Sequence, residues 1–149
     1  MDHCKAITDE SFLCASFSQL LVLDLNFCRQ LQDDSVIQII KSSKNLTILR
    51  LSYCYNLTDK VLEALVDGEK KTLPNLKRIH LDEVGNITER AARSVLRVYG
   101  DQLDNFSVNG CENISSQLIT EMKEKGIRTS ESGLSFDYKA MQRMFHGCP

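Results

Sequence analysis

The stretch that decides the fold is residues 46–59, which read LTILRLSYCYNLTD. Its first half alternates apolar and polar side chains, the pattern of a strand with one buried face. A cysteine, a further apolar position and an acidic residue follow. The same mask of apolar positions occurs in residues 20–33 (LLVLDLNFCRQLQD), 76–89 (LKRIHLDEVGNITE) and 103–116 (LDNFSVNGCENISS). Four copies in one register identify an internal repeat. The one wider gap between copies is filled by residues 67–72, which predict a polar surface loop.

Each copy predicts one strand followed by one helix. Apolar residues at helical spacing follow the first copy at Val36, Ile39 and Ile40. Helix N-caps, whose oxygens accept unpaired backbone N–H groups, are expected at Asp9, Asp33, Asp59 and Ser116. One strand and one helix cannot bury their apolar sides alone, but stacked copies can. The sequence therefore predicts an α/β fold, a leucine-rich-repeat solenoid with a parallel β-sheet on the concave face and α-helices on the convex face.

The repeats divide the chain into a solenoid over residues 1–126 and a C-terminal cap or tail over residues 127–149. A partial copy at residues 4–9 has the cysteine and the helix start but no strand before it. Gly126 is expected to end the last helix, and Ile127 to begin a truncated final strand.

The predicted first strand, residues 20–25, would have an unpaired edge, which is a pairing and aggregation hazard. Two interpretations stay open. The chain is a fragment or short isoform of a longer solenoid, or the edge is covered by a partner or by a second copy of the chain.

Composition and charge exclude several classes of protein. Hydrophobic residues make up 42% of the chain and charged residues 26%, an ordinary balance for a globular domain. The net charge of -2 provides no general attraction to nucleic acid or to an anionic membrane. The apolar run at residues 20–23 is too short to span a bilayer, and residues 1–5 lack an apolar signal region. A cytoplasmic or nuclear location is therefore expected.

The cysteines and histidines indicate neither a metal site nor a catalytic site. No Cys-x-x-Cys pair occurs among the six cysteines, which argues against zinc. Cys28, Cys54 and Cys111 share one repeat position, so we expect them to be buried, reduced and unliganded, whereas Cys148 should react first. His80 should point outward from its strand and lie at the surface. We expect no catalytic residue, no cofactor and no metal, and hence no enzyme.

Five Asn-x-Ser/Thr sequons are present, and Asn56, Asn86 and Asn113 share one repeat position. This recurrence favours a structural role for these asparagines over glycosylation.

Residues 28–33 and 54–59, the latter reading CYNLTD, resemble the cysteine-containing class of leucine-rich repeats. That class is found in F-box/leucine-rich-repeat proteins and in relatives that lack the F-box. The resemblance covers roughly residues 4–125. It implies that the repeats select a protein, while a separate F-box, not visible in this chain, recruits the ubiquitin-ligase scaffold.

Alternation also predicts which side chains face outward from the sheet. Because parallel strands lie in register about 4.8 Å apart, equivalent outward positions form rows. The rows are Val22, Ile48, Arg78, Asn105; then Asp24, Arg50, His80, Ser107; then Asn26, Ser52, Asp82, Asn109; and, at the rim, Phe27, Tyr53, Glu83, Gly110.

Aromatic residues and arginine are enriched at the hot spots of protein interfaces. The partner-binding residues expected on the concave face are therefore Phe27, Tyr53, Asp24, Arg50, Arg78, His80 and Asp82. On this interpretation Tyr53→Ala with Arg50→Glu abolishes partner capture and leaves the melting transition nearly unchanged. The alternative is that these residues only make the sheet compatible with solvent, and that helical faces, loops or ends bind the partner.

Two functional hypotheses follow. The first is a protein–protein interaction module, with substrate recognition in a ubiquitin-ligase adaptor system as its most specific form. The second is a structural or assembly factor that stacks on another subunit, or on itself, through its N-terminal edge strand. Protein partners are expected in both cases, and neither nucleic acid nor a membrane.

Overall fold

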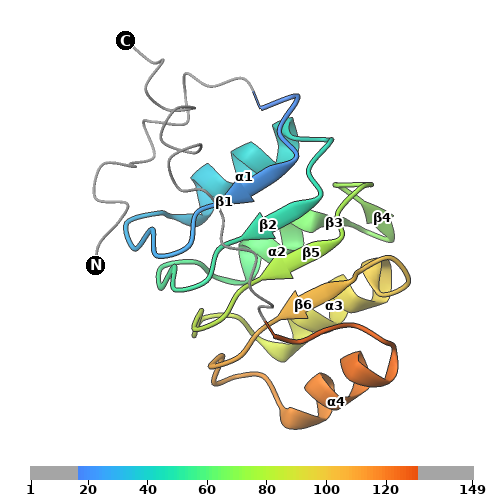
Figure 1. Ribbon diagram of the computed structural model, residues 1–149. Coiled ribbons are helices and arrows are strands. Elements are labelled where there is room, and N and C mark those ends of the chain that lie inside the picture. The colour runs from blue at the N-terminus through green and yellow to red at the C-terminus, as the bar shows by residue number, and fades with distance from the viewer. Residues whose placement is uncertain (1–16, 131–149) are drawn as a thin grey trace.

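The structure is a computed structural model that describes residues 17–130 (Figure 1). The partial copy at residues 4–9, the expected cap Asp9, Cys148 and most of the predicted tail lie outside the described residues. In the part that is described, no helix combines the length and the apolar character needed to cross a bilayer.

A four-stranded parallel sheet forms the centre of the fold. Its strands are β1 (Val22–Asp24), β2 (Ile48–Arg50), β5 (Arg78–His80) and β6 (Asn105–Ser107). They lie in the order β1-β2-β5-β6, which is their order in the sequence. Leu49 pairs with Leu23 on one side and with Ile79 on the other, so equivalent positions of the copies are in register. The predicted parallel strands are confirmed.

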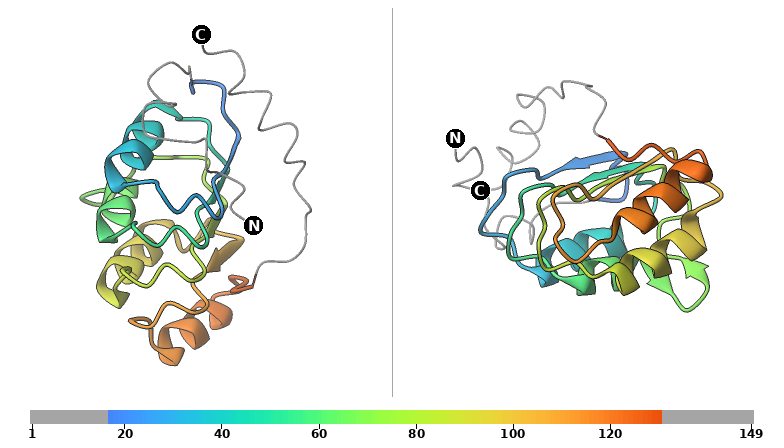
Figure 2. Two further views of the ribbon diagram at one scale, coloured as in Figure 1. Left: turned by 90° about the vertical axis from the view of Figure 1, so that its left-hand side faces the viewer. Right: turned by 90° about the horizontal axis from the view of Figure 1, so that it is seen from below.

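One helix follows each strand of this sheet. The helices are α1 (Asp33–Ser42), α2 (Asp59–Leu65), α3 (Glu89–Tyr99) and α4 (Ser116–Glu124). All four lie on the same face of the sheet, side by side (Figure 2). The recurring apolar positions meet between the two layers, where Leu25, Leu51 and Leu81 are fully buried. The predicted α/β class, with helices on one face of a parallel sheet, is confirmed.

The helix caps lie one residue before Asp33, Asp59 and Ser116, where the sequence predicted them, and the helix of the third copy, for which no cap was predicted, is capped as well. They are Gln32, Thr58, Thr88 and Ser115. Asp33 and Asp59 are instead first helical residues, and each accepts hydrogen bonds from the next copy. The Asp59 carboxylate accepts the backbone N–H of Thr88 at 2.7 Å and its hydroxyl at 2.6 Å. The Asp33 carboxylate binds Thr58 in the same way. The aspartate thus links one copy to the next. The threonine hydroxyl donates to this aspartate, and its oxygen accepts a backbone N–H of its own helix as the cap.

The predicted loop at residues 67–72 is exposed but contains a small antiparallel hairpin. Its strands are β3 (Val66–Asp67) and β4 (Lys70–Lys71), and Gly68 in the turn has a φ of 64°. The buried Tyr99 hydroxyl holds the base of the insertion, because it donates to Leu65 O at 2.7 Å and accepts from Leu73 N at 3.1 Å.

The last helix ends at Gly126, as expected. Its φ is 78°, its N–H donates to Lys123 O at 2.9 Å, and Ile127 N donates to Met122 O at 3.0 Å. These two bonds form a Schellman motif. Arg128 then pairs with Asn105 of β6 in a parallel bridge. The truncated final strand expected after Gly126 is therefore present as one bridge at the sheet edge.

The repeat cysteines and the repeat asparagines form hydrogen bonds between copies. Cys54 Sγ donates to Leu25 O at 3.0 Å, and Cys111 Sγ donates to Leu81 O at 3.1 Å. The cysteine is therefore both a small buried side chain and a donor to a strand-end carbonyl. The amides of Asn56, Asn86 and Asn113 likewise donate to a backbone carbonyl of the preceding copy, at 2.8 to 3.0 Å. This agrees with the structural interpretation of these three sequons.

The repeat cysteines should resist thiol reagents. Cys28, Cys54 and Cys111 are buried thiols, as predicted, and burial raises the pKa of Cys111 to about 11. The thiolate is the reactive form, so we expect negligible modification of all three in the native protein. Iodoacetamide labelling followed by peptide mass spectrometry measures this, with the unfolded protein as the control. Modification of the three at the rate of the unfolded chain would contradict it.

Candidate partner-binding surface

The second outward row of the sheet is largely buried. Arg50 is 5% exposed and His80 is 3% exposed, and Arg50 Nη1 lies 3.1 Å from Asp24 Oδ2. The expectation that His80 is a surface residue is wrong. β2 and β5 are inner strands, so side chains from both flanking strands lie against Arg50 and His80 about 4.8 Å away. Alternation predicted the face correctly but not this crowding.

His80 is uncharged at neutral pH. Burial and the nearby Arg50 guanidinium lower its pKa to about 4, and they outweigh the raising effect of Asp82 and Asp24. A neutral, buried imidazole cannot form an ion pair with a partner's carboxylate. His80 was expected to contact a partner, but in the structure its imidazole is buried and uncharged.

The third row is a ladder of hydrogen bonds between copies. Asn26 Oδ1 accepts the backbone N–H of Ser52 at 2.8 Å, and Ser52 Oγ accepts that of Asp82 at 3.1 Å. Asp82 Oδ1 in turn accepts the backbone N–H of Asn109 at 2.7 Å, and it also accepts the Ser107 hydroxyl. Asp82 was expected to contact a partner, but the structure uses its carboxylate to join β5 to β6.

The rim row has an unusual backbone. Phe27, Tyr53, Glu83 and Gly110 all have positive φ, between 60° and 73°. Their conformation suits glycine, whereas a bulky residue there is an outlier. The left-handed conformation costs a residue with a Cβ roughly 1–2 kcal/mol. Gly110 shows that the fold accepts glycine at this position, so the aromatic side chains of Phe27 and Tyr53 are not required by the turn.

The two aromatic rings stack on each other. Their centroids are 4.5 Å apart and their planes differ by 7°. Phe27 is 39% exposed, and Tyr53 is partly exposed. The sequence predicted that these residues lie side by side at the rim, and the structure brings them together there.

A second pair beside the stack was missed in the sequence. The Arg29 guanidinium carbon lies 5.3 Å from the centre of the Tyr55 ring, and Tyr55 is 43% exposed. Arg29 and Tyr55 directly follow the cysteine in the first two copies, two positions after the rim row. Aligning one more row of equivalent positions would have placed them side by side. We call Phe27, Arg29, Tyr53 and Tyr55 the rim patch.

The predicted concave site is therefore divided. Phe27 and Tyr53 belong to the exposed rim patch, and Arg78 is half-buried in the first row. Asp24 and Arg50 pair with each other, while His80 and Asp82 are buried. The accessible aromatic surface lies at the turns that follow β1 and β2, rather than over the middle of the sheet.

No protein-family model matches the chain, and no curated protein sequence matches it. Several solved structures are similar in fold, and two of them are the following. The crystal structure of the Rad7 and Elc1 complex in yeast has a TM-score of 0.55 at 20% identity, over 85% of this chain and 37% of that one. Leiomodin-1 actin-binding site 2 has a TM-score of 0.56 at 9% identity, over 87% of this chain and 78% of that one. The chain thus spans little more than a third of the first of these proteins. At such low identities the likeness is one of fold, a parallel sheet lined by helices.

Proposed function

We propose that this chain is a leucine-rich-repeat solenoid that binds a partner protein through the rim patch. The observation that carries the proposal is the stacked pair Phe27 and Tyr53, of which Phe27 is exposed and Tyr53 partly exposed. Both residues have a left-handed backbone, which favours glycine. The positive φ of these two residues is a conformational outlier, and such strain is concentrated at functional sites. We therefore infer that the rings are retained for function.

The rim patch has the composition and the rigidity of an interface anchor. Tyrosine and arginine are enriched among residues that dominate binding energy. Because the Phe27 and Tyr53 rings already stack, and Arg29 already lies over Tyr55, little side-chain freedom remains to be lost on binding. Preorganisation of this kind increases affinity.

The similar structures support protein binding as the class of function. One was solved as a complex of Rad7 with Elc1, and the other is named as an actin-binding site. The resemblance of residues 28–33 and 54–59 to F-box/leucine-rich-repeat proteins supports a narrower form, substrate recognition in a ubiquitin-ligase adaptor system. A cytoplasmic or nuclear location and the absence of enzymatic activity are part of this proposal.

One observation favours the alternative, an assembly factor that stacks through its first strand. In the described part of the chain β1 pairs only with β2, and Leu21, which directly precedes β1, is 58% exposed. Stacking on another subunit, or on a second copy, would cover this edge.

Phe27→Ala with Tyr53→Ala should abolish partner capture. Each lost anchor typically costs about 2 kcal/mol or more of binding free energy. Alanine keeps the Cβ, so the backbone strain is unchanged and only the rings are removed. Affinity capture from cells with quantitative mass spectrometry, followed by titration of the captured protein, measures the effect.

Leu21→Ala is the matched control, because it also removes an exposed apolar side chain but lies outside the rim patch. Capture lost in the rim variant and kept in the control supports the proposal. The opposite result supports stacking through β1. Thermal unfolding of both variants within a few degrees of the wild type excludes a general folding defect.

A further inference from the structure

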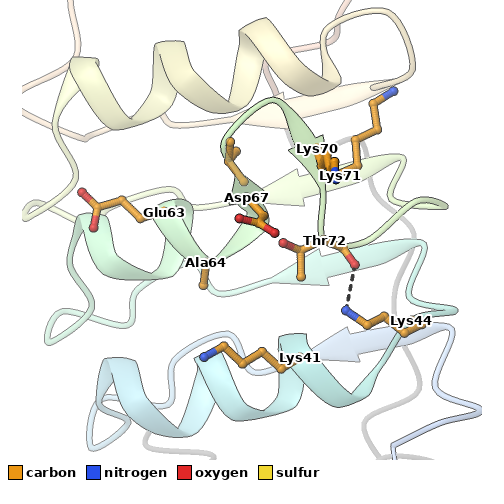
Figure 3. Close-up of a pocket in the computed structure, with 9 residues that line it drawn as sticks. Lys41, Lys44, Glu63, Ala64, Asp67, Lys70, Lys71 and Thr72 are labelled. Atoms are coloured by element: carbon orange, nitrogen blue, oxygen red, sulfur yellow. Dashed lines mark hydrogen bonds between the residues drawn. The ribbon is translucent and has the colours of Figure 1, made fainter.

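The β3–β4 hairpin lies on the opposite side of the sheet from the turns that follow β1 and β2, which carry the rim patch (Figure 1). Two hollows flank this hairpin. The first hollow, of about 470 Å³, separates the hairpin from the end of α1. The second, of about 590 Å³, separates it from the ends of α3 and α4. Lys71 of β4 lines both. Figure 3 shows the first hollow, with Lys44 reaching from the end of α1 to Thr72 O, 3.2 Å away.

The hollows concentrate positive charge in a chain whose net charge is -2. Seven basic and four acidic side chains line them. Three of the acidic residues already pair with basic ones: Glu63 with Arg90, Asp101 with Lys71, and Glu121 with Arg93. Among the described residues, five basic side chains have no ion-pair partner, and these are Lys41, Lys44, Lys70, Arg97 and Lys125. Of the four acidic residues that line the hollows, Asp67 alone has no ion pair within residues 17–130, and Glu69 follows it in the turn of the hairpin.

The helix dipoles explain part of this pattern. Lys41 and Arg97 lie in the last turns of α1 and α3, where a positive charge is stabilising. Lys70 lies in the hairpin, outside any helix. The insertion has no net charge, because Asp67 and Glu69 balance Lys70 and Lys71. It nevertheless places two lysines beside side chains that are already basic, and this local repulsion does not help the fold.

We propose that an acidic segment of a partner protein docks against the hairpin and its two hollows. Spaced carboxylates fit a site whose lining holds seven basic side chains and also Glu63, Asp67 and Asp101. A nucleic-acid backbone fits less well, because it carries a closely spaced charge along its whole length. This surface is separate from the rim patch, so the inference stands independently of the proposed function.

The test uses the full chain and, as the probe, a fluorescein-labelled (Glu-Ser-Gly)5 peptide, whose carboxylates are spaced along the chain. The variant is Lys41→Glu with Lys70→Glu, which reverses one charge on each side of the first hollow. The control is Lys60→Glu with Lys77→Glu, which makes the same change in net charge at two exposed lysines that line neither hollow. Fluorescence anisotropy gives the affinities, and circular dichroism checks that both variants are folded.

We expect the hollow variant to bind the probe at least about tenfold more weakly than the wild type, since contacts between surface charges are worth on the order of a tenfold change each. The control should change it less than about threefold, because distant exposed charges are screened by salt. Phe27→Ala with Tyr53→Ala should bind the probe as the wild type does, which separates this site from the proposed function. Equal weakening by the variant and the control would overturn the inference, and so would no binding by the wild type. Tighter binding of a labelled oligo-deoxyadenosine at the same ionic strength, lost in the hollow variant, would overturn it in favour of nucleic acid.

Discussion

Arg50→Glu is expected to destabilise the protein by about 3–5 kcal/mol, the typical cost of breaking a buried ion pair by changing one partner. Arg50 is 5% exposed and pairs with Asp24 at 3.1 Å. A glutamate in its place would leave two carboxylates close together in a largely buried row. Urea denaturation followed by circular dichroism gives the change in the free energy of unfolding.

Arg78→Glu is the matched control for this change. Arg78 pairs in register with Ile48 of the neighbouring strand, but it is half-buried and has no ion-pair partner among residues 17–130. We expect this variant to lose less than about 1 kcal/mol. Equal losses in the two variants would show that the ion pair does not stabilise the sheet. Because Arg50 is buried and paired, this prediction replaces the expectation from the sequence that Arg50→Glu, combined with Tyr53→Ala, leaves the melting transition nearly unchanged.

Asp82→Ala is expected to cost about 2–4 kcal/mol. Its carboxylate oxygen accepts the backbone N–H of Asn109 at 2.7 Å and the Ser107 hydroxyl. A buried donor left without an acceptor costs about 1–3 kcal/mol. Without Asp82 the Ser107 hydroxyl keeps only a longer contact of 3.4 Å to Thr129 O, and the Asn109 N–H, which is partly buried, loses its acceptor. Because Asp82 joins β5 to β6, hydrogen exchange should increase most at residues 105–109. The same urea titration measures the loss of stability.

Asp82→Asn tests whether the acceptor or the charge matters. The corresponding position is Asn26 in the first copy and Asn109 in the fourth, and Asn26 Oδ1 accepts the backbone N–H of Ser52 at 2.8 Å. An asparagine at position 82 can offer the same oxygen, so we expect a loss below about 1 kcal/mol. A loss as large as that of Asp82→Ala would show that the negative charge is essential.

These variants separate the two parts of the face that the sequence treated as one site. The buried rows, with Asp24–Arg50 and Asp82–Asn109, hold neighbouring strands together. The rim patch is exposed and rests on the turns that those rows support. Variants of the buried rows should therefore affect stability first, and variants of Phe27 and Tyr53 should affect binding first.

The sequence by itself determined the parallel sheet, its register and the helix that follows each strand. The reason is that buried positions must be apolar at a fixed spacing, so Leu23, Leu49 and Ile79 could be aligned without a structure. The positions of Cys54 and Cys111 in the core followed from the same alignment. It also indicated that Phe27 and Tyr53 would be neighbours, since in-register strands place equivalent residues side by side.

Only the tertiary structure decided how each polar side chain is used. Aspartate and threonine are both good helix caps, and Thr88 takes the cap because the Asp59 carboxylate of the preceding copy receives its hydroxyl hydrogen. Alternation assigns Arg50 and His80 to a face of the sheet, but their burial depends on the side chains of neighbouring strands. The residue types Phe27 and Tyr53 do not predict a left-handed backbone. Gly110, at the equivalent position of the fourth copy, is the residue that indicates it. Each of these outcomes depends on contacts between copies about 25 to 30 residues apart in the chain, which no local pattern encodes.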